Sequence, residues 1–78
     1  MRPKNSPGIP TWRGDALRLR RIAAGWTTVS LAERVGVSKS TLARWEAGEH
    51  APPSTAVADL AEALDVPRAA FARQPKIV

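Results

Sequence analysis

Positively charged and hydroxyl side chains gather between residues 39 and 44, and no acidic residue interrupts them. The stretch contains two cations, two hydroxyl groups and one methyl group on Lys39, Arg44, Ser40, Thr41 and Ala43. Cations and hydroxyl groups attract a polyanion and donate hydrogen bonds to its oxygens. These residue types therefore suit the binding of a polyanion rather than a chemical reaction.

The residues that most enzymes need are missing. The 78-residue chain has no cysteine, no tyrosine, one histidine and no glycine-rich phosphate loop. A nucleophile with its base, or a set of metal ligands, cannot be assembled from these residues. We expect no catalytic residue, no metal, no cofactor and no enzyme activity. The lone histidine, His50, is interpreted as a surface residue near a bound phosphate.

The net charge of +5 is unevenly distributed along the chain. Residues 1–44 hold nine Lys and Arg against two acidic residues, whereas residues 45–78 hold three against five, giving balances of +7 and −2. A basic end beside a slightly acidic one is typical of a protein that binds a polyanion, with salt-dependent contacts. The alternative is a basic surface that only faces solvent.

Two short helical patterns surround a turn in the middle of the chain. Helices are predicted over residues 28–35 and 39–47 because apolar residues recur three and four positions apart in each. Thr27 is placed to cap the first helix, and Gly48 to end the second. Between them, Gly36-Val37-Ser38 can end one helix, anchor the turn and cap the next. The pattern predicts a helix-turn-helix.

The residues before this unit predict a helix over 12–24, capped by Thr11, with Gly14 a mild weakness inside it. One inward seam carries Leu17, Arg21 and Ala24. A second apolar row, the helix-one stripe, consists of Trp12, Ala16, Leu19 and Ala23. Such a row is either covered by the N-terminal segment or a contact surface for another protein.

The remaining segments complete a small all-α domain. A helix is predicted over 55–64, capped by Ser54 or Thr55, and a short fifth helix over 67–72. Residues 1–10, rich in proline, are interpreted as a flexible basic arm, 11–72 as the domain and 73–78 as a tail. No long apolar run or signal peptide is present, so we expect no membrane contact and a cytoplasmic protein.

The order of Leu31-Ala32, Gly36-Val37-Ser38, Leu42, Trp45-Glu46-x-Gly48 and Pro52 resembles the phage repressor and Cro class of helix-turn-helix regulators, the xenobiotic-response-element family. The resemblance covers roughly residues 17–66. It implies a lambda-repressor-like bundle of five short helices that binds double-stranded DNA.

The resemblance assigns roles to particular residues. Base reading falls on Lys39, Ser40, Ala43 and Arg44, and phosphate contacts on Thr27, Thr28, Ser38, Thr41 and His50. Arg2, Lys4 and Arg13 are candidate DNA contacts of the N-terminal arm, and Arg21 is expected to form a structural ion pair with Glu46. The chain departs from the family at Thr28, where many relatives have glutamine, and at Asp65, where glycine commonly ends the fourth helix.

The function implied is a sequence-specific transcriptional regulator of a bacterium or phage. We expect a repressor that binds an inverted repeat as a homodimer, formed through the tail or the helix-one stripe. Little chain lies beyond the domain, so no small-molecule ligand is expected. The alternative is an antitoxin or adaptor that binds another protein. Binding of single-stranded nucleic acid is disfavoured because the tryptophans are placed for packing.

Overall fold

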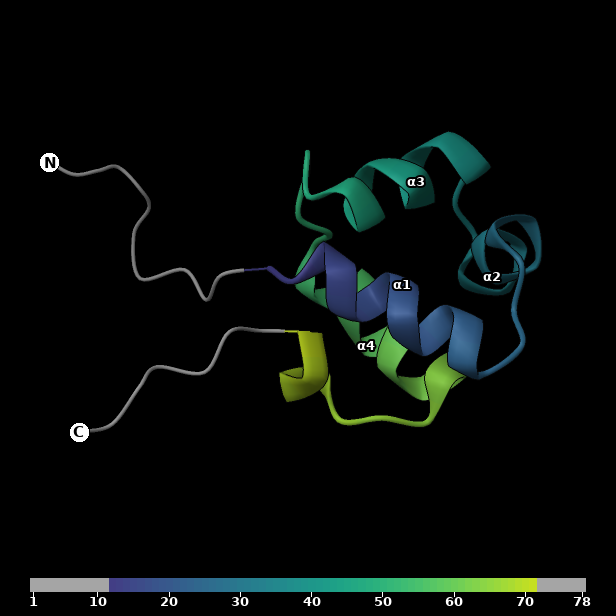
Figure 1. Cartoon of the computed structure of the whole chain (residues 1–78). Helices are drawn as coiled ribbons and strands as arrows, with labels where there is room; N and C mark the ends of the chain where they lie inside the picture. The colour runs from purple at the N-terminus through teal and green to yellow at the C-terminus, as the bar shows by residue number, and fades with distance from the viewer. Residues whose placement is uncertain (1–11, 72–78) are drawn as a thin grey trace, which may run out of the picture.

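The structure, a computed structural model, describes residues 12–71 and contains four α-helices followed by a 3-10 turn. The helices are α1 (Gly14–Ala23), α2 (Thr28–Val35), α3 (Lys39–Ala47) and α4 (Ser54–Leu64), and the 3-10 turn η1 is Arg68–Phe71. Figure 1 shows α1 in front of α4, with α3 along one side of α1 and α2 at one end. The expected all-α, lambda-repressor-like fold is confirmed, with a 3-10 turn in place of the fifth helix.

Local capping determines the bounds of α2 and α3. The hydroxyl of Thr27 accepts a hydrogen bond from the Ser30 amide at 2.9 Å, and the hydroxyl of Ser38 accepts one from the Thr41 amide at 3.0 Å. Gly36 and Gly48 end the two helices in the left-handed region, which a residue without a Cβ enters at no steric cost. Both helices have the bounds that the sequence predicts.

One apolar core joins all five elements. Its fully buried side chains are Leu17 from α1, Leu31 from α2, Leu42 from α3, Leu60 from α4 and Phe71 from η1. No polar or charged residue among those described is fully buried. Burial of a leucine or phenylalanine side chain stabilises a fold by about 1.5–3 kcal/mol, so these side chains are the main source of stability.

The start of α1 differs from the prediction. The helix begins at Gly14, its N-cap is Arg13, and no side chain caps it; Thr11 lies outside the described residues. Gly14 is buried, and a Cβ there would lie 2.4 Å from the Trp45 carbonyl oxygen and 2.5 Å from that of Glu46. The interpretation of Gly14 as a weakness was wrong, because its missing side chain lets α1 approach the end of α3.

The helix-one stripe does not form one surface. Trp12 and Ala16 are half-buried and pack against the core, and the Trp12 ring centroid lies 5.7 Å from that of Phe71. Leu19 and Ala23 are exposed. The stripe therefore divides into a packed half, which contributes to the fold, and an open half on the outer side of α1.

The C-terminal elements also differ in detail. α4 begins at Ser54 after Pro53, and no side chain caps it, so the predicted cap by Ser54 or Thr55 was wrong. Asp65 ends α4 in the left-handed conformation with φ 58°. The segment predicted as a helix over 67–72 forms the 3-10 turn η1, which still places Phe71 in the core.

The arm over 1–10, with Arg2 and Lys4, and the tail over 73–78 lie outside the described residues. None of the helices described within 12–71 has the length and apolar character needed to cross a membrane.

Candidate nucleic-acid interface

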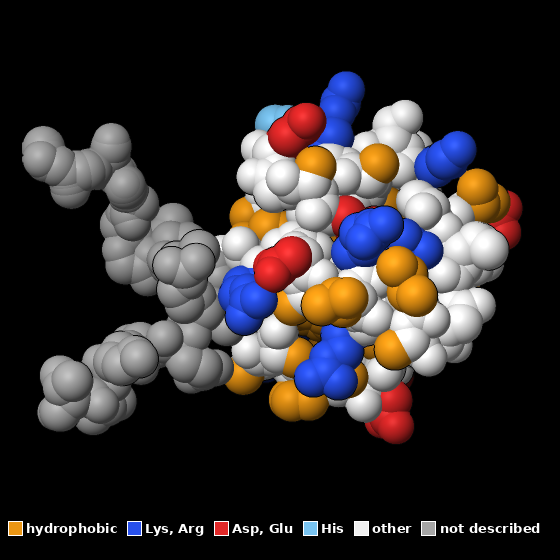
Figure 2. All heavy atoms as spheres, viewed as in Figure 1, with side chains coloured by type: hydrophobic (Ala, Val, Ile, Leu, Met, Phe, Trp, Pro, Cys, Tyr) orange, Lys and Arg blue, Asp and Glu red, His pale blue; other side chains and the backbone are white. Residues whose placement is uncertain are grey.

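The outer face of α3 presents the residues that the sequence proposes for base reading. Lys39, Ser40, Ala43 and Arg44 are all exposed. Leu42 and Trp45, on the opposite side of the same helix, are buried in the core. Lys and Arg side chains project from the edge of the molecule that α3 forms (Figure 2). The helix thus offers donors and a methyl group to solvent on one side and is anchored by large apolar side chains on the other.

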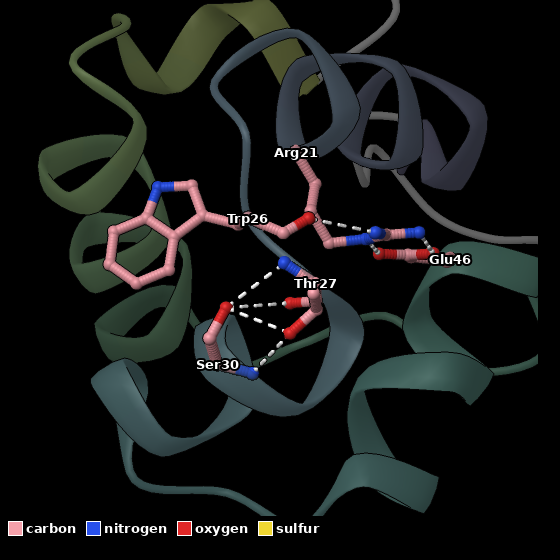
Figure 3. Close-up of polar contacts among 5 residues, drawn as sticks. All are labelled: Arg21, Trp26, Thr27, Ser30 and Glu46. Carbon is pink, nitrogen blue, oxygen red and sulfur yellow. Dashed lines mark hydrogen bonds and ion pairs between the residues drawn. The ribbon is translucent and has the colours of Figure 1, made fainter.

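A polar network connects α1, α2 and α3 (Figure 3). The Nε of Arg21 donates to Glu46 Oε2 at 2.6 Å, and its Nη2 donates to Oε1 at 3.2 Å. The remaining Nη1 donates to the Trp26 carbonyl oxygen at 3.0 Å, directly before the cap of α2. The two charged side chains are 12% and 9% exposed, so solvent screens the pair only weakly. Arg21 thereby fixes both α3 and the start of α2 relative to α1.

The N-terminus of α2 is a capping box that uses the hydroxyl proposed as a phosphate contact. The Thr27 amide donates to Ser30 Oγ at 2.9 Å, while the Thr27 hydroxyl accepts from the Ser30 amide (Figure 3). The amides of Thr28 and Val29 fall in the first turn, where a helix offers no acceptor. An anion at this end would bind these two amides, while Thr27 shapes the turn that presents them.

The N-terminus of α3 has a similar arrangement. Ser38 Oγ donates to Thr41 Oγ1 at 2.9 Å and accepts the Thr41 amide, so both of its hydrogen-bonding roles are occupied. The Thr41 hydroxyl, which accepts from Ser38, keeps its own hydrogen to donate to an external acceptor. Thr41 is half-buried at the edge of the exposed face, and His50 is exposed in the loop after Gly48.

Arg13 lies on the folded domain and not on the arm. Its guanidinium donates to Asp15 at 2.7 Å, and its amide donates to the Phe71 carbonyl oxygen at 2.8 Å. The hydrogen bond from Arg13 lowers the pKa of the Asp15 carboxyl below its ordinary value. A DNA contact by Arg13 would have to compete with this exposed pair.

Sequence reasoning missed four residues that position the site. Trp12 donates its indole N–H to the Trp45 carbonyl oxygen at 2.7 Å, Gly14 allows the close approach of α1, Ser30 completes the capping box, and Trp26 accepts from Arg21. Only Ser30 had a local signal, a hydroxyl residue three positions after Thr27. The other three act through contacts with residues distant in sequence or through a backbone carbonyl.

Within 12–71, no group of three His, Cys, Asp or Glu residues could hold a metal ion.

The chain matches a known domain family over residues 14–74, the helix-turn-helix domain. Comparison with curated proteins gives no match. Among solved structures, the restriction-modification controller protein C.AhdI from Aeromonas hydrophila is 30% identical with a TM-score of 0.69, and the match covers 73% of this chain and 83% of that protein. The P22 c2 repressor in complex with a synthetic operator is 28% identical with a TM-score of 0.69, covering 72% of this chain and 85% of the repressor.

A third similar structure is an enzyme. Hydroxypropylphosphonic acid epoxidase from S. wedmorenis is 25% identical with a TM-score of 0.73, and the match covers 83% of this chain but only 36% of the epoxidase. The shared part is therefore about a third of that enzyme.

The family match spans all four helices of this chain, and the controller protein is 30% identical over most of its length. The chain therefore belongs to the helix-turn-helix family of the phage repressor and Cro type.

Proposed function

We propose that the chain is a sequence-specific DNA-binding transcriptional regulator that places α3 in the major groove. The observation that carries this proposal is the exposed face of α3, which has two cations and no acidic residue. The opposite side of the helix is held in place by buried apolar side chains and by the Arg21–Glu46 pair. In a helix-turn-helix the second helix of the unit reads base edges and the first meets the phosphate backbone. A controller protein and an operator-bound repressor share this fold with the chain.

Base reading follows from the side chains on α3. Arg44 can donate two parallel hydrogen bonds to O6 and N7 of a guanine, and Lys39 can donate as a single charged group. Ala43 would contact a thymine methyl group, and Ser40 would bind whichever base edge lies opposite. A good two-bond contact discriminates against a wrong base by about 1–3 kcal/mol.

Phosphate binding would use groups around the α3 face. The free amides of Thr28 and Val29 and the positive end of the α2 dipole favour an anion. The Thr41 hydroxyl and His50 would contact the backbone beside α3, and Arg2 and Lys4 of the arm would extend the contact. Thr28 stands where many relatives have glutamine and has a shorter side chain, so we propose that the amides take a larger share of the phosphate contact.

Repression would result from occupying a promoter in the bacterial cytoplasm. We propose a homodimer on an inverted repeat, with the tail as one candidate interface. Binding is the activity that the described residues support, since α3 offers a donor-rich face to solvent.

The test is selection of binders from random duplex DNA at near-physiological salt, followed by affinity measurements on the enriched site. An inverted repeat with half-sites about 10 bp apart is expected. Arg44→Ala and Lys39→Ala should each relax the preference at one base position, by about 1–3 kcal/mol. Arg68→Ala removes an exposed arginine from η1, far from α3 in sequence, and serves as the matched control. Unchanged affinity and preference in the two α3 variants would contradict the proposal.

A second candidate function is supported by one observation. Leu19 and Ile22 expose large apolar side chains on α1, which DNA binding does not require. An antitoxin or adaptor would use such a surface for another protein, and it could do so with α3 bound to DNA.

A further inference from the structure

The outer side of α1 carries a small apolar surface, the α1 ridge, formed by Leu19, Ile22 and Ala23. Leu19 is 62% exposed and Ile22 is 50% exposed. The three residues lie three and four positions apart and so share one face of the helix. Among the described residues the only other exposed large hydrophobic side chain is Val29 on α2. The ridge is therefore a local feature and not part of a generally apolar surface.

The ridge faces away from the candidate DNA interface. Gly14 and Arg21 mark the side of α1 that contacts α3. Leu19, Ile22 and Ala23 follow Gly14 by five, eight and nine residues, which places them roughly 140°, 80° and 180° around the helix from that contact, so the centre of the ridge points away from α3. A partner on the ridge would therefore leave the exposed face of α3 open, and DNA in contact with α3 would leave the ridge open.

Positive charge lies on both flanks of the ridge. Arg18 and Arg20 adjoin Leu19 in sequence and project roughly 100° to either side of it. Both are exposed, and neither forms an ion pair with a carboxylate among the described residues. Asp15, the acidic residue nearest to them on α1, is already paired with Arg13. Figure 2 shows hydrophobic side chains over α1 with Lys and Arg side chains around them.

We propose that the α1 ridge binds an amphipathic helix of another protein, one whose apolar stripe is flanked by Asp and Glu. The apolar ridge would contact the apolar stripe of the partner helix, and the two unpaired arginines would pair with the acidic residues on its flanks. A second copy of this chain fits less well, because it would bring its own arginines and a net charge of +5 against the same surface. Duplex DNA fits less well, because leucine and isoleucine offer phosphates no hydrogen bond. The proposal is independent of the DNA-binding function and rests on the second candidate function, the binding of another protein through Leu19 and Ile22.

The experiment uses the full chain and three synthetic helical peptides of equal length. One has a leucine stripe with glutamate flanks, the second the same stripe with lysine flanks, and the third a serine stripe with glutamate flanks. Binding is measured by fluorescence anisotropy of labelled peptides and located by NMR amide shifts. We expect the first peptide to bind, with shifts centred on α1, and the other two to bind at least about tenfold more weakly, a difference that the method resolves readily.

Variants of exposed residues separate the apolar and charged contributions. Leu19→Ser should weaken binding of the first peptide about tenfold, whereas Val29→Ser, its matched control on α2, should not. Arg18→Glu should weaken the binding of the peptide with leucine stripe and glutamate flanks and strengthen the binding of the lysine-flanked peptide. Arg68→Glu should change neither affinity. The thermal unfolding midpoint of each variant is compared with that of the wild type, to check that the fold is intact.

Three results would overturn the proposal. Equal binding by wild type and Leu19→Ser would mean that overall positive charge attracts the peptide. Loss of self-association in Leu19→Ser, measured by sedimentation, with unchanged peptide binding would make a second copy the occupant. Displacement of the peptide by duplex DNA would assign the ridge to the DNA interface. DNA affinity of Leu19→Ser is measured separately, so failure of this proposal is distinguishable from failure of the proposed function.

Discussion

The indole N–H of Trp12 donates a hydrogen bond of 2.7 Å to the carbonyl oxygen of Trp45. Trp45 lies in the last turn of α3, and its carbonyl oxygen also accepts a hydrogen bond from the C-cap amide of Gly48 at 3.1 Å. The Trp12 ring also lies against Phe71, and the adjacent Arg13 amide donates to the Phe71 carbonyl oxygen at 2.8 Å. Residues 12 and 13 thus connect the end of the candidate reading helix to the end of η1.

Trp12→Phe should test the role of this bond. Phenylalanine keeps an apolar ring beside Phe71 but loses the N–H, and a lost hydrogen bond costs about 0.5–1.5 kcal/mol in free energy of unfolding. We expect urea denaturation to show a loss of this size and DNA titration to show a lower ratio of specific to non-specific affinity. Trp26→Phe is the control, because the Trp26 indole makes no hydrogen bond within 12–71. An unchanged ratio would show that the bond stabilises the fold without positioning α3.

Gly14→Ala should destabilise the protein although alanine favours helix formation by about 1 kcal/mol. The added Cβ would meet two backbone carbonyl oxygens, those of Trp45 and Glu46, which have no flexible side chain to move away. Overpacking of this kind costs about 1–3 kcal/mol, and α1 would have to shift away from α3. Thermal or urea unfolding measures the change. Ala23→Gly, at an exposed site in the same helix, should cost about 0.5–1 kcal/mol and so report ordinary helix propensity. A Gly14→Ala protein more stable than wild type would refute the packing argument.

Arg21→Met should lower the free energy of unfolding by about 3 kcal/mol, because it leaves the Glu46 carboxylate with little solvent and no ionic partner. Replacing both residues, in Arg21→Met with Glu46→Leu, should restore most of that loss, since an apolar pair avoids the cost of an isolated charge. The four proteins form a double-mutant cycle in urea. Additive losses would mean that the two side chains do not interact in solution.

Asp65→Gly should raise the free energy of unfolding by about 0.5 kcal/mol. Glycine removes the strain of the left-handed backbone, and this gain exceeds the loss caused by the greater conformational entropy of the unfolded chain. The φ of 58° at Asp65 is the only positive φ among described residues other than glycine. Asp59→Gly, inside α4, should instead cost about 0.3 kcal/mol, the difference between the helix propensities of the two residues. Chemical denaturation of both variants compares the signs. A loss in Asp65→Gly would indicate that the aspartate side chain contributes to this turn.

The central part of the fold could be predicted from sequence because its signals are local. α2 and α3 are delimited by Thr27, Gly36, Ser38 and Gly48, each of which acts on backbone groups within a few residues of itself. The start of α1 could not be predicted in this way. Gly14 and Trp12 derive their roles from carbonyl groups more than 30 residues away, at Trp45 and Glu46, and no local pattern reports that contact.

The candidate site was only partly predictable for the same reason. Exposure of Lys39, Ser40, Ala43 and Arg44 follows from the helical period and the burial of Leu42. The helix-one stripe was misjudged because periodicity identifies an apolar face without telling how far the neighbouring elements cover it. η1 covers the Trp12 end of that face and leaves Leu19 open. The DNA contacts assigned to individual residues remain predictions.

The Arg21 guanidinium shares its hydrogen bonds between Glu46, on the inner side of α3, and the Trp26 carbonyl oxygen, just before α2. The side chains at 40, 43 and 44 take no part in this network. We therefore expect that other side chains at these three positions would change which DNA sequence is bound. The orientation of α3 relative to α1 would stay the same, because the contacts that set it are made by other residues.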